Sequence, residues 1–156
     1  MTKSEELQQY WRQYQEEHGY EPSGTRVVVD WAVSKGYLAP PKVDPLDILA
    51  DRMARALREE TTVDEHGREY RVNHSRRITK NGNQITIWAM MDHASLEHME
   101  MAFTQRREQI VGDCLHLRND VDVYNGKHPE NRQYDLDLNF TEDVEERLAF
   151  VHEKVA

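Results

Sequence analysis

The spacing of apolar residues predicts helices in the first third of the chain. One stripe, at positions i, i+3, i+4 and i+7, consists of Leu7, Tyr10, Trp11 and Tyr14. It predicts a helix from Ser4 to His18, with Ser4 as the N-cap and Gly19 as the stop signal. A second helix is expected over residues 25–35, although three consecutive valines there also favour a strand. We favour the helix because Gly36 follows as a C-terminal cap.

A third helix is predicted where Pro45 follows Asp44, because proline suits the first position of a helix and aspartate suits its cap. This helix should end near Glu60. Its expected buried side consists of Leu46, Leu49, Met53, Ala54 and Leu57.

A β-hairpin is predicted around the pair Asn81-Gly82, which lies between two extended runs. Both turn positions of such a hairpin need a positive φ, which asparagine and glycine adopt most readily. The arms are expected at residues 69–78 and 84–91. Trp88 alternates away from the face that carries the isoleucines of the second arm. One face must therefore be covered by the third helix, by the last helix or by a partner.

The longest predicted element is a helix from Ser95 to Tyr124, with the stop signal Asn125-Gly126 behind it. Its apolar series has heptad-like spacing with one extra four-residue step, and consists of Leu96, Met99, Phe103, Ile110, Cys114, Leu117, Val121 and Tyr124. Arg106 occupies a slot where an apolar residue is expected. The helix is either the central core helix of a monomer or a seam for a second copy, and its length favours the second interpretation.

Strict alternation near the C-terminus predicts a half-buried strand over residues 133–140, before a helix capped by Thr141. The alternating apolar residues are Tyr134, Leu136, Leu138 and Phe140. We therefore expect an α+β protein, mostly helical, with a β-hairpin, one long helix, and a C-terminal strand and helix. Its expected parts are residues 1–94, a long core or dimerisation helix over 95–125, and a C-terminal arm over 126–156.

Composition narrows the function class. The 156 residues carry a formal net charge of −9, which argues against a generally basic nucleic-acid coat protein. A single cysteine excludes a disulfide scaffold and a cysteine-based zinc cluster. The first 20 residues hold no apolar run and no window suits a membrane helix, so we expect a cytoplasmic protein without membrane contact. No catalytic motif is found, so we expect no enzyme activity, no cofactor and no metal.

The hairpin region is the one segment that is not acidic. Residues 61–94 hold 4 acids and 5 bases, whereas the rest of the chain is acidic. The bases predicted to contact phosphate are Arg71, Arg76, Arg77 and Lys80. An alternative stays open, because Asp135 and Asp137 on an adjacent strand could neutralise these arginines within the sheet.

The order of three helices, a hairpin and a long helix over residues 4–125 resembles that of winged helix-turn-helix regulators, some of which dimerise through such a helix. This resemblance implies that residues 1–94 form a winged-helix-like domain, in which the third helix approaches the DNA groove and the hairpin is the wing. The residues that would approach the groove are Arg52, Arg55 and Arg58. Acidic residues on the same helix depart from this picture, and an ordinary solvated face with pairs such as Asp51–Arg55 is the alternative.

Three functions follow as hypotheses. The first is a non-catalytic regulator that binds duplex DNA, as a homodimer. The second is an acidic protein-interaction or inhibitory module that binds another protein through its long helix and C-terminal arm, because an alternating strand can extend a partner's sheet. The third is a metal-dependent enzyme that uses Asp113, His116 and Asp120, which share a helical face but lack matching ligands elsewhere. Cys114 is interpreted as a small core residue rather than a nucleophile.

Overall fold

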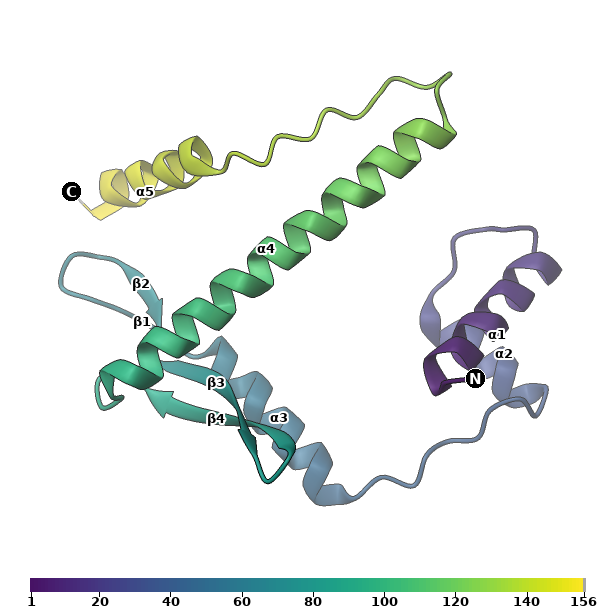
Figure 1. Ribbon diagram of the computed structural model, residues 1–156, viewed down its shortest axis with the longest axis horizontal. Coiled ribbons are helices and arrows are strands. Elements are labelled where there is room, and N and C mark those ends of the chain that lie inside the picture. The colour runs from purple at the N-terminus through teal and green to yellow at the C-terminus, as the bar shows by residue number, and fades with distance from the viewer. Residues whose placement is uncertain (156) are drawn as a thin grey trace. The chain divides into compact units, whose positions relative to one another are not determined.

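The computed structural model describes residues 1–155, and the side-chain surroundings of all of these except His152, Lys154 and Val155. Within them, the chain is α+β and mostly helical, as predicted, with five helices and two antiparallel sheets of two strands each (Figure 1). None of the described helices combines the length and apolar character that a membrane crossing requires. The chain forms two compact units, Met1–Leu49 and a second that begins at Ala50.

Helices α1 (Lys3–Glu17) and α2 (Thr25–Ser34) form the first unit. The prediction of a helix rather than a strand over the valines is confirmed. The predicted N-cap was wrong, because Thr2 caps α1 instead of Ser4. The backbone N–H of Glu5 donates to Thr2 Oγ1 at 3.2 Å, and the N–H of Thr2 donates to the Glu5 carboxylate at 2.6 Å. This reciprocal pair satisfies two N–H groups that the first turn leaves free.

An aromatic cluster joins α1 to α2 and to the residues behind them. Tyr14 stacks on His18 with ring centroids 4.0 Å apart, and Trp31 meets Tyr14 edge-on at 5.5 Å. Tyr37 stacks on Tyr10 at 5.3 Å. The cluster holds Tyr37 against the two helices because Gly36 adopts φ 75°, a left-handed turn that favours glycine. Tyr10 and Tyr14 of the predicted stripe therefore contribute to the core of this unit, whereas Leu7 and Trp11 are 50% and 41% exposed.

Helix α3 (Pro45–Glu59) begins and ends as predicted, and the boundary between the two units falls inside it at Leu49. Asp44 Oδ1 accepts the backbone N–H of Leu46 at 2.9 Å, which confirms the predicted cap. The predicted buried side was wrong: no described residue of α3 is buried, and Met53 is 61% exposed. The boundary between the two units lies within α3 and not at residue 94 or 125. The winged-helix arrangement and the predicted division of the chain at residues 94 and 125 therefore stay predictions.

The strands form two separate pairs instead of one long hairpin. The sheets consist of β1 (Thr61–Val63) with β2 (Glu69–Arg71), and β3 (Asn73–Lys80) with β4 (Asn83–Met90). The predicted first arm over residues 69–78 was wrong because the chain leaves one sheet at Val72 and enters the other. The N–H of Val72 donates to the carbonyl of Glu60, and its carbonyl accepts from Met91. The predicted turn is confirmed, with φ 53° at Asn81 and 77° at Gly82.

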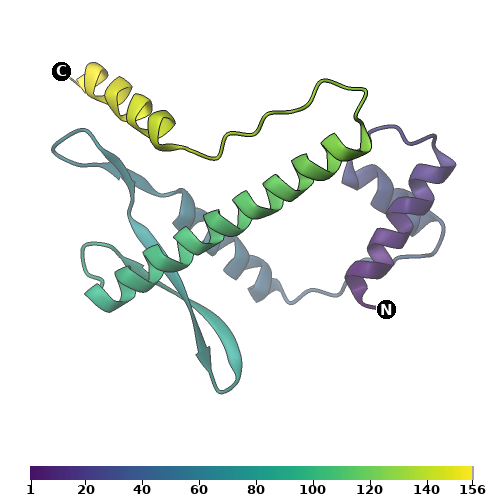
Figure 2. The same ribbon diagram turned by 45° about the horizontal axis from the view of Figure 1, so that its top comes forward.

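Helix α4 (Leu96–Lys127) has 32 residues and a length of about 48 Å. The predicted start at Ser95 is confirmed, and this residue caps the helix, since its Oγ accepts the N–H of His98 at 3.1 Å. The predicted stop at Asn125-Gly126 was wrong, since the helix continues through both residues to Lys127. Figures 1 and 2 show α4 running across the β3–β4 hairpin.

The predicted strand over residues 133–140 was wrong. This segment is irregular and leads to α5 (Thr141–Val155). An alternating sequence becomes a strand only beside another strand, and both described sheets consist of two strands only. The segment is instead attached to α4 by Asn125, whose side chain accepts the N–H of Tyr134 and donates to its carbonyl, each at 3.0 Å.

A candidate anion-binding cleft

Buried histidines fix the β3–β4 hairpin against α4. His98 and His74 are 5% and 7% exposed. The Nε2 of His98 lies 2.8 Å from the backbone carbonyl of His74, and the Nε2 of His74 lies 2.9 Å from the carbonyl of Arg71. A carbonyl only accepts, so both imidazoles carry their proton on Nε2. Each ring thus donates to the backbone and sets the position of β3.

Gln105 connects α4 to β3 further along the strand. Its side-chain oxygen accepts the backbone N–H of Arg77 at 2.8 Å, and its Nε2 donates to the Arg77 carbonyl at 3.0 Å. The carboxamide thus takes the place that a residue of a third strand would take at this edge. We call this pair of hydrogen bonds the Gln105 clamp. It holds α4 beside the strand that carries the arginines.

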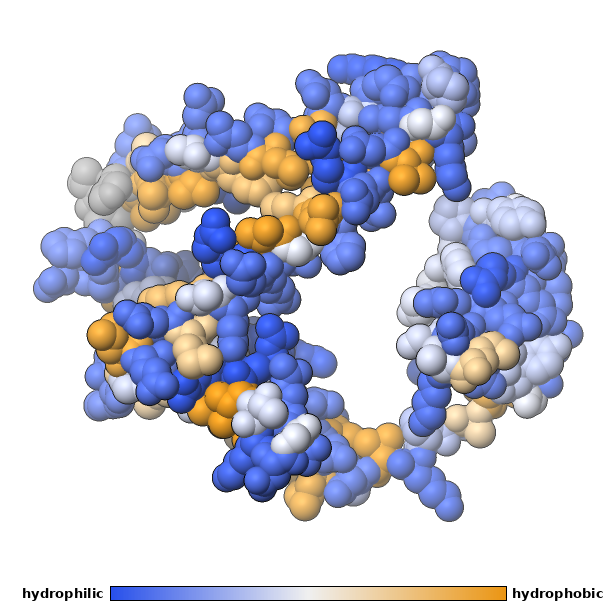
Figure 3. All heavy atoms as spheres, in the orientation of Figure 1, coloured by the Kyte–Doolittle hydropathy of each residue, from blue (hydrophilic) through white to orange (hydrophobic). Residues whose placement is uncertain are grey.

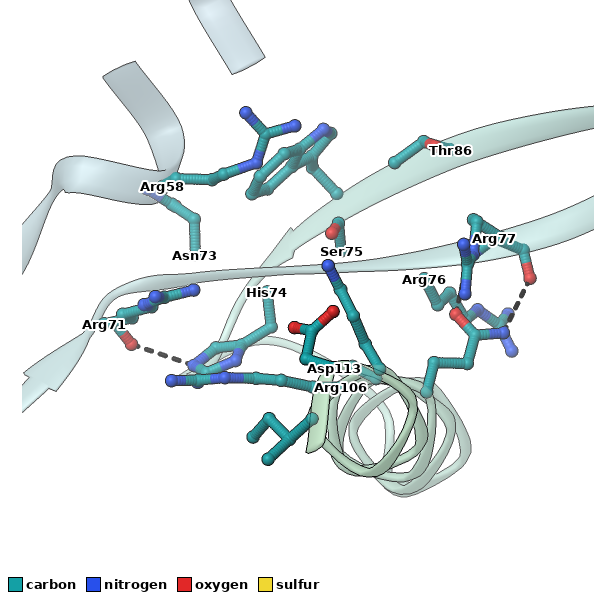
Figure 4. A pocket seen from close by; sticks show the side chains of 15 residues that line it. Arg58, Arg71, Asn73, His74, Ser75, Arg76, Arg77, Thr86, Arg106 and Asp113 are labelled. Carbon is teal, nitrogen blue, oxygen red and sulfur yellow. Dashed lines mark hydrogen bonds between the residues drawn. The ribbon is translucent and has the colours of Figure 1, made fainter. Parts of the chain in front are cut away.

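A cleft with a volume of about 650 Å³ lies among β3, β4, α4 and the end of α3 (Figure 4). The described residues that line it include a single acid, Asp113. They also include five arginines: Arg58, Arg71, Arg76, Arg77 and Arg106. Because these come from the end of α3, from both sheets and from α4, the cluster exists only in the folded second unit. We call it the arginine cleft.

Strand alternation distributes the cleft residues over both faces of the hairpin. Ser75 lies opposite Trp88, and Arg77 lies opposite Thr86. The guanidinium of Arg58 lies over the Trp88 ring, 5.7 Å from its centroid. The third helix therefore covers Trp88, which is one of the alternatives that the sequence left open. A cation on an aromatic face loses little charge, so Arg58 stays available to an anion.

The arginines are poorly neutralised by the protein. Arg76 lies 3.9 Å from Glu97 and donates from Nη1 to the sulfur of Met101 at 3.0 Å, while its buried Nε has no partner among the described residues. The other four arginines form no ion pair in the described part of the chain. Burial, and then the nearby charge of Arg71, lower the pKa of Arg106. A lowered pKa means that the surroundings of Arg106 destabilise the charged form of its guanidinium group.

His74 experiences the same positive field. Burial is the largest cause that lowers its pKa, and the charges of Arg106, Arg71 and His98 lower it further, against the hydrogen bond to Arg71. The imidazole is therefore neutral at pH 7. An anion in the cleft would offset the arginine charges and raise the pKa of His74.

The structure brings together four of the seven residues predicted to bind nucleic acid. Arg58, Arg71, Arg76 and Arg77 line the cleft, whereas Arg52, Arg55 and Lys80 do not. The sequence interpretation missed Arg106 and Gln105. The signal for Arg106 was its place in an apolar series: a charged residue at such a position indicates a polar environment on that side of the helix.

Two alternatives left open by the sequence are not seen in the described residues. Asp135 and Asp137 form no ion pair with the arginines, and Asp137 instead accepts the N–H of Asn139 at 2.8 Å. No three histidine, cysteine or acidic side chains of the described chain lie close enough together to bind a metal ion. The Asp113, His116 and Asp120 set is thus not assembled there.

No family model, curated protein or solved structure matches this chain. A function can therefore be proposed only from the arginine cleft and the elements that build it.

Proposed function

We propose that this protein is a non-catalytic regulator that binds duplex DNA through phosphates held in the arginine cleft. The observation that carries the proposal is the gathering of five guanidinium groups in one cleft with one carboxylate, in a chain of net charge −9. Like charges repel, so their assembly costs free energy unless an external anion compensates it. An acidic chain with carboxylates in excess has no need to leave arginines unpaired for stability alone.

Phosphate is the anion that suits this cleft. Guanidinium groups bind phosphate oxygens with two parallel hydrogen bonds, which fix position as well as charge. Ser75 and Thr86 add hydroxyl donors beside them. Mixed arginine and hydroxyl donors are typical of contacts to the DNA backbone.

Salt dependence of binding tests the proposal. We expect the affinity for a labelled duplex, measured by fluorescence anisotropy between about 50 and 200 mM salt, to fall with a log–log slope of about −3.6 if four arginines contact phosphate. Arg106→Ala should make that slope shallower by about 0.9. The matched control is Arg26→Ala, since Arg26 lies on α2, is exposed and is paired with Asp30 at 3.0 Å. Absence of binding at the lowest salt would refute the proposal.

A second pair of variants separates the cleft from the winged-helix mode of binding. In that mode Arg55 approaches the groove, whereas it does not line the cleft. If the cleft binds DNA, Arg55→Ala should leave affinity and slope within error and Arg106→Ala should not. The opposite result would favour the reader-helix geometry and reject the cleft as the site.

The protein-interaction module is the second candidate, and the irregular segment over residues 132–140 supports it. Tyr134 and Phe140 are 63% and 43% exposed, and the segment forms no sheet hydrogen bonds among the described residues. Such a segment can add to the sheet edge of a partner. Backbone amide exchange tests it: exchange over residues 135–138, whose N–H groups form no hydrogen bond among the described residues, should be fast in the isolated chain and slow in a complex.

A further inference from the structure

The fold of the single chain leaves much of the apolar series of α4 exposed. In the described part of α4 only His98 and Ala102 are buried, and both belong to the face that contacts the hairpin. The predicted apolar series runs beside this face: Phe103 meets the His74 ring edge-on at 5.5 Å and Ile110 lines the arginine cleft. Phe103 and Ile110 are nevertheless 50% and 51% exposed, and Leu117 is 46% exposed. Figure 3 shows orange apolar side chains along α4. A helix of an aqueous protein with such a stripe normally packs it against another element.

The spacing of this series has a symmetry that indicates which element covers it. Counting outward from Ile110 in either direction, seam positions follow after four, three, four and three residues. The positions N-terminal to Ile110 are Arg106, Phe103, Met99 and Leu96; those C-terminal to it are Cys114, Leu117, Val121 and Tyr124. The spacing of the series is therefore symmetric about Ile110, and the extra four-residue step is one of the two steps that flank this residue. A pattern that reads the same in both directions suits an identical helix that runs the opposite way.

We propose that two copies of this chain pair their α4 helices in antiparallel orientation, with a two-fold axis at Ile110. Each seam residue then meets its mirror position in the partner: Leu96 meets Tyr124, Met99 meets Val121, Phe103 meets Leu117, and Arg106 meets Cys114. In heptad terms, every one of these pairs joins an a position to a d position. This is the matching that antiparallel coiled coils use, and only Ile110 meets itself.

Charges beside the seam support the same orientation. Glu100 and Arg118 both follow a d position of the series, so both lie on the same flank of α4. In the antiparallel pair the Glu100 of one copy lies within two residues of the Arg118 of the other, and the two-fold axis repeats the contact. In a parallel pair, flanking positions of the same kind do not meet across the seam in this way. Glu100 forms no ion pair among the described residues, whereas Arg118 forms an exposed pair with Asp122 at 3.1 Å, which the contact across the seam would share or replace.

The exposed apolar area suits a dimer. The two ends of the series, Leu96 and Tyr124, are 74% and 52% exposed. Together with the three central residues, Phe103, Ile110 and Leu117, and taking about 200 Å² for each free side chain, they offer about 550 Å² of each copy for burial. The flanking residues bring this toward the roughly 800 Å² per partner of a standard interface.

The state of association tests the interface in the full chain. At about 20–50 µM, a concentration above a micromolar dissociation constant, we expect the wild-type protein to sediment with twice the mass of one chain. Ile110→Glu places two carboxylates on the axis and should weaken dimerisation by about 100-fold or more. Leu115→Glu is the matched control, because Leu115 is 58% exposed on the same helix but lies off the seam. A monomeric wild type, or equal effects of both variants, would overturn the proposal.

Orientation is tested by distance and by exchange of charges. Spin labels on Leu96→Cys, in a Cys114→Ser background, should be about 42 Å apart in the antiparallel dimer. A separation near the ~10 Å between packed helix axes would mean a parallel pair and reject the symmetry argument. Glu100→Arg should weaken the dimer, and the double variant Glu100→Arg/Arg118→Glu should restore it. Failure of the double variant to recover would reject the flanking pair.

This interface does not depend on the proposed DNA binding. The sedimentation and spin-label experiments use protein without DNA. Ile110 and Arg106 also line the cleft, so the two proposals are compared through the DNA affinity and the mass of the wild-type protein. A dimer without DNA affinity would reject the proposed function alone, whereas DNA binding by a monomer would reject the interface alone.

Discussion

Removal of the Gln105 clamp should separate α4 from β3, and its effect can be worked out from the structure. Gln105→Ala deletes two hydrogen bonds to Arg77, of 2.8 and 3.0 Å. Each such bond contributes about 0.5–1.5 kcal/mol. Gln105 is half-buried, so water replaces part of the loss, and the lower half of the summed range applies. We expect the local opening of this edge to become easier by about 1–2 kcal/mol, which is about 5–30-fold in its equilibrium constant.

Hydrogen exchange of the Arg77 amide measures this opening directly, because that N–H donates to Gln105. Its protection factor should fall by about 5–30-fold in Gln105→Ala. The control is Gln109→Ala, one turn along α4, since Gln109 lines the cleft and forms no hydrogen bond among the described residues. Unchanged exchange of the Arg77 amide in Gln105→Ala, or an equal loss in the control, would show that the clamp does not hold the edge.

Three further outcomes are expected. Burial lowers the pKa of His74 below its usual 6.5, so below that pH the unfolded chain binds a proton that the folded chain refuses. Stability should therefore decline as pH falls from 7 toward 5 in denaturant titrations, and His74→Gln should reduce that decline. Gly82→Ala forces a methyl group into a turn with φ 77° and should cost about 1–2 kcal/mol in the same titrations. Gly112→Ala should instead raise stability, by up to about 1 kcal/mol, because a Cβ there meets nothing within 4 Å; a loss would mean that the helix needs the glycine.

Local signals predicted most of the helices and one turn. Asp44-Pro45, Ser95 and Asn81-Gly82 set their own backbone geometry through caps and turn preferences, so they act the same way in any fold. The stop at Asn125-Gly126 failed because asparagine and glycine also tolerate helical conformation. A proline two residues beyond Lys127 cannot continue the helix in its usual way, and it marks the end better.

Partners set by tertiary structure could not be predicted. The segment over residues 133–140 alternates as a strand does, but alternation describes a half-buried environment and does not supply a neighbouring strand. In the same way, nothing local indicates that Arg58 and Arg106, 48 positions apart in the chain, line one cleft. Three of the four predicted hairpin bases, Arg71, Arg76 and Arg77, line the cleft, and they lie within a few residues of each other in the sequence, whereas Lys80 does not line it.

The Gln105 clamp has a consequence for aggregation. A ribbon of two strands exposes two edges, and each can recruit a further chain until fibrils grow. The clamp occupies the outer edge of β3 at Arg77, so another molecule can add only beside β4. Two copies that met edge to edge through β4 would each present a blocked side outward. Growth by edge pairing would then stop at two molecules joined through their β4 strands, unless α4 first separated from β3.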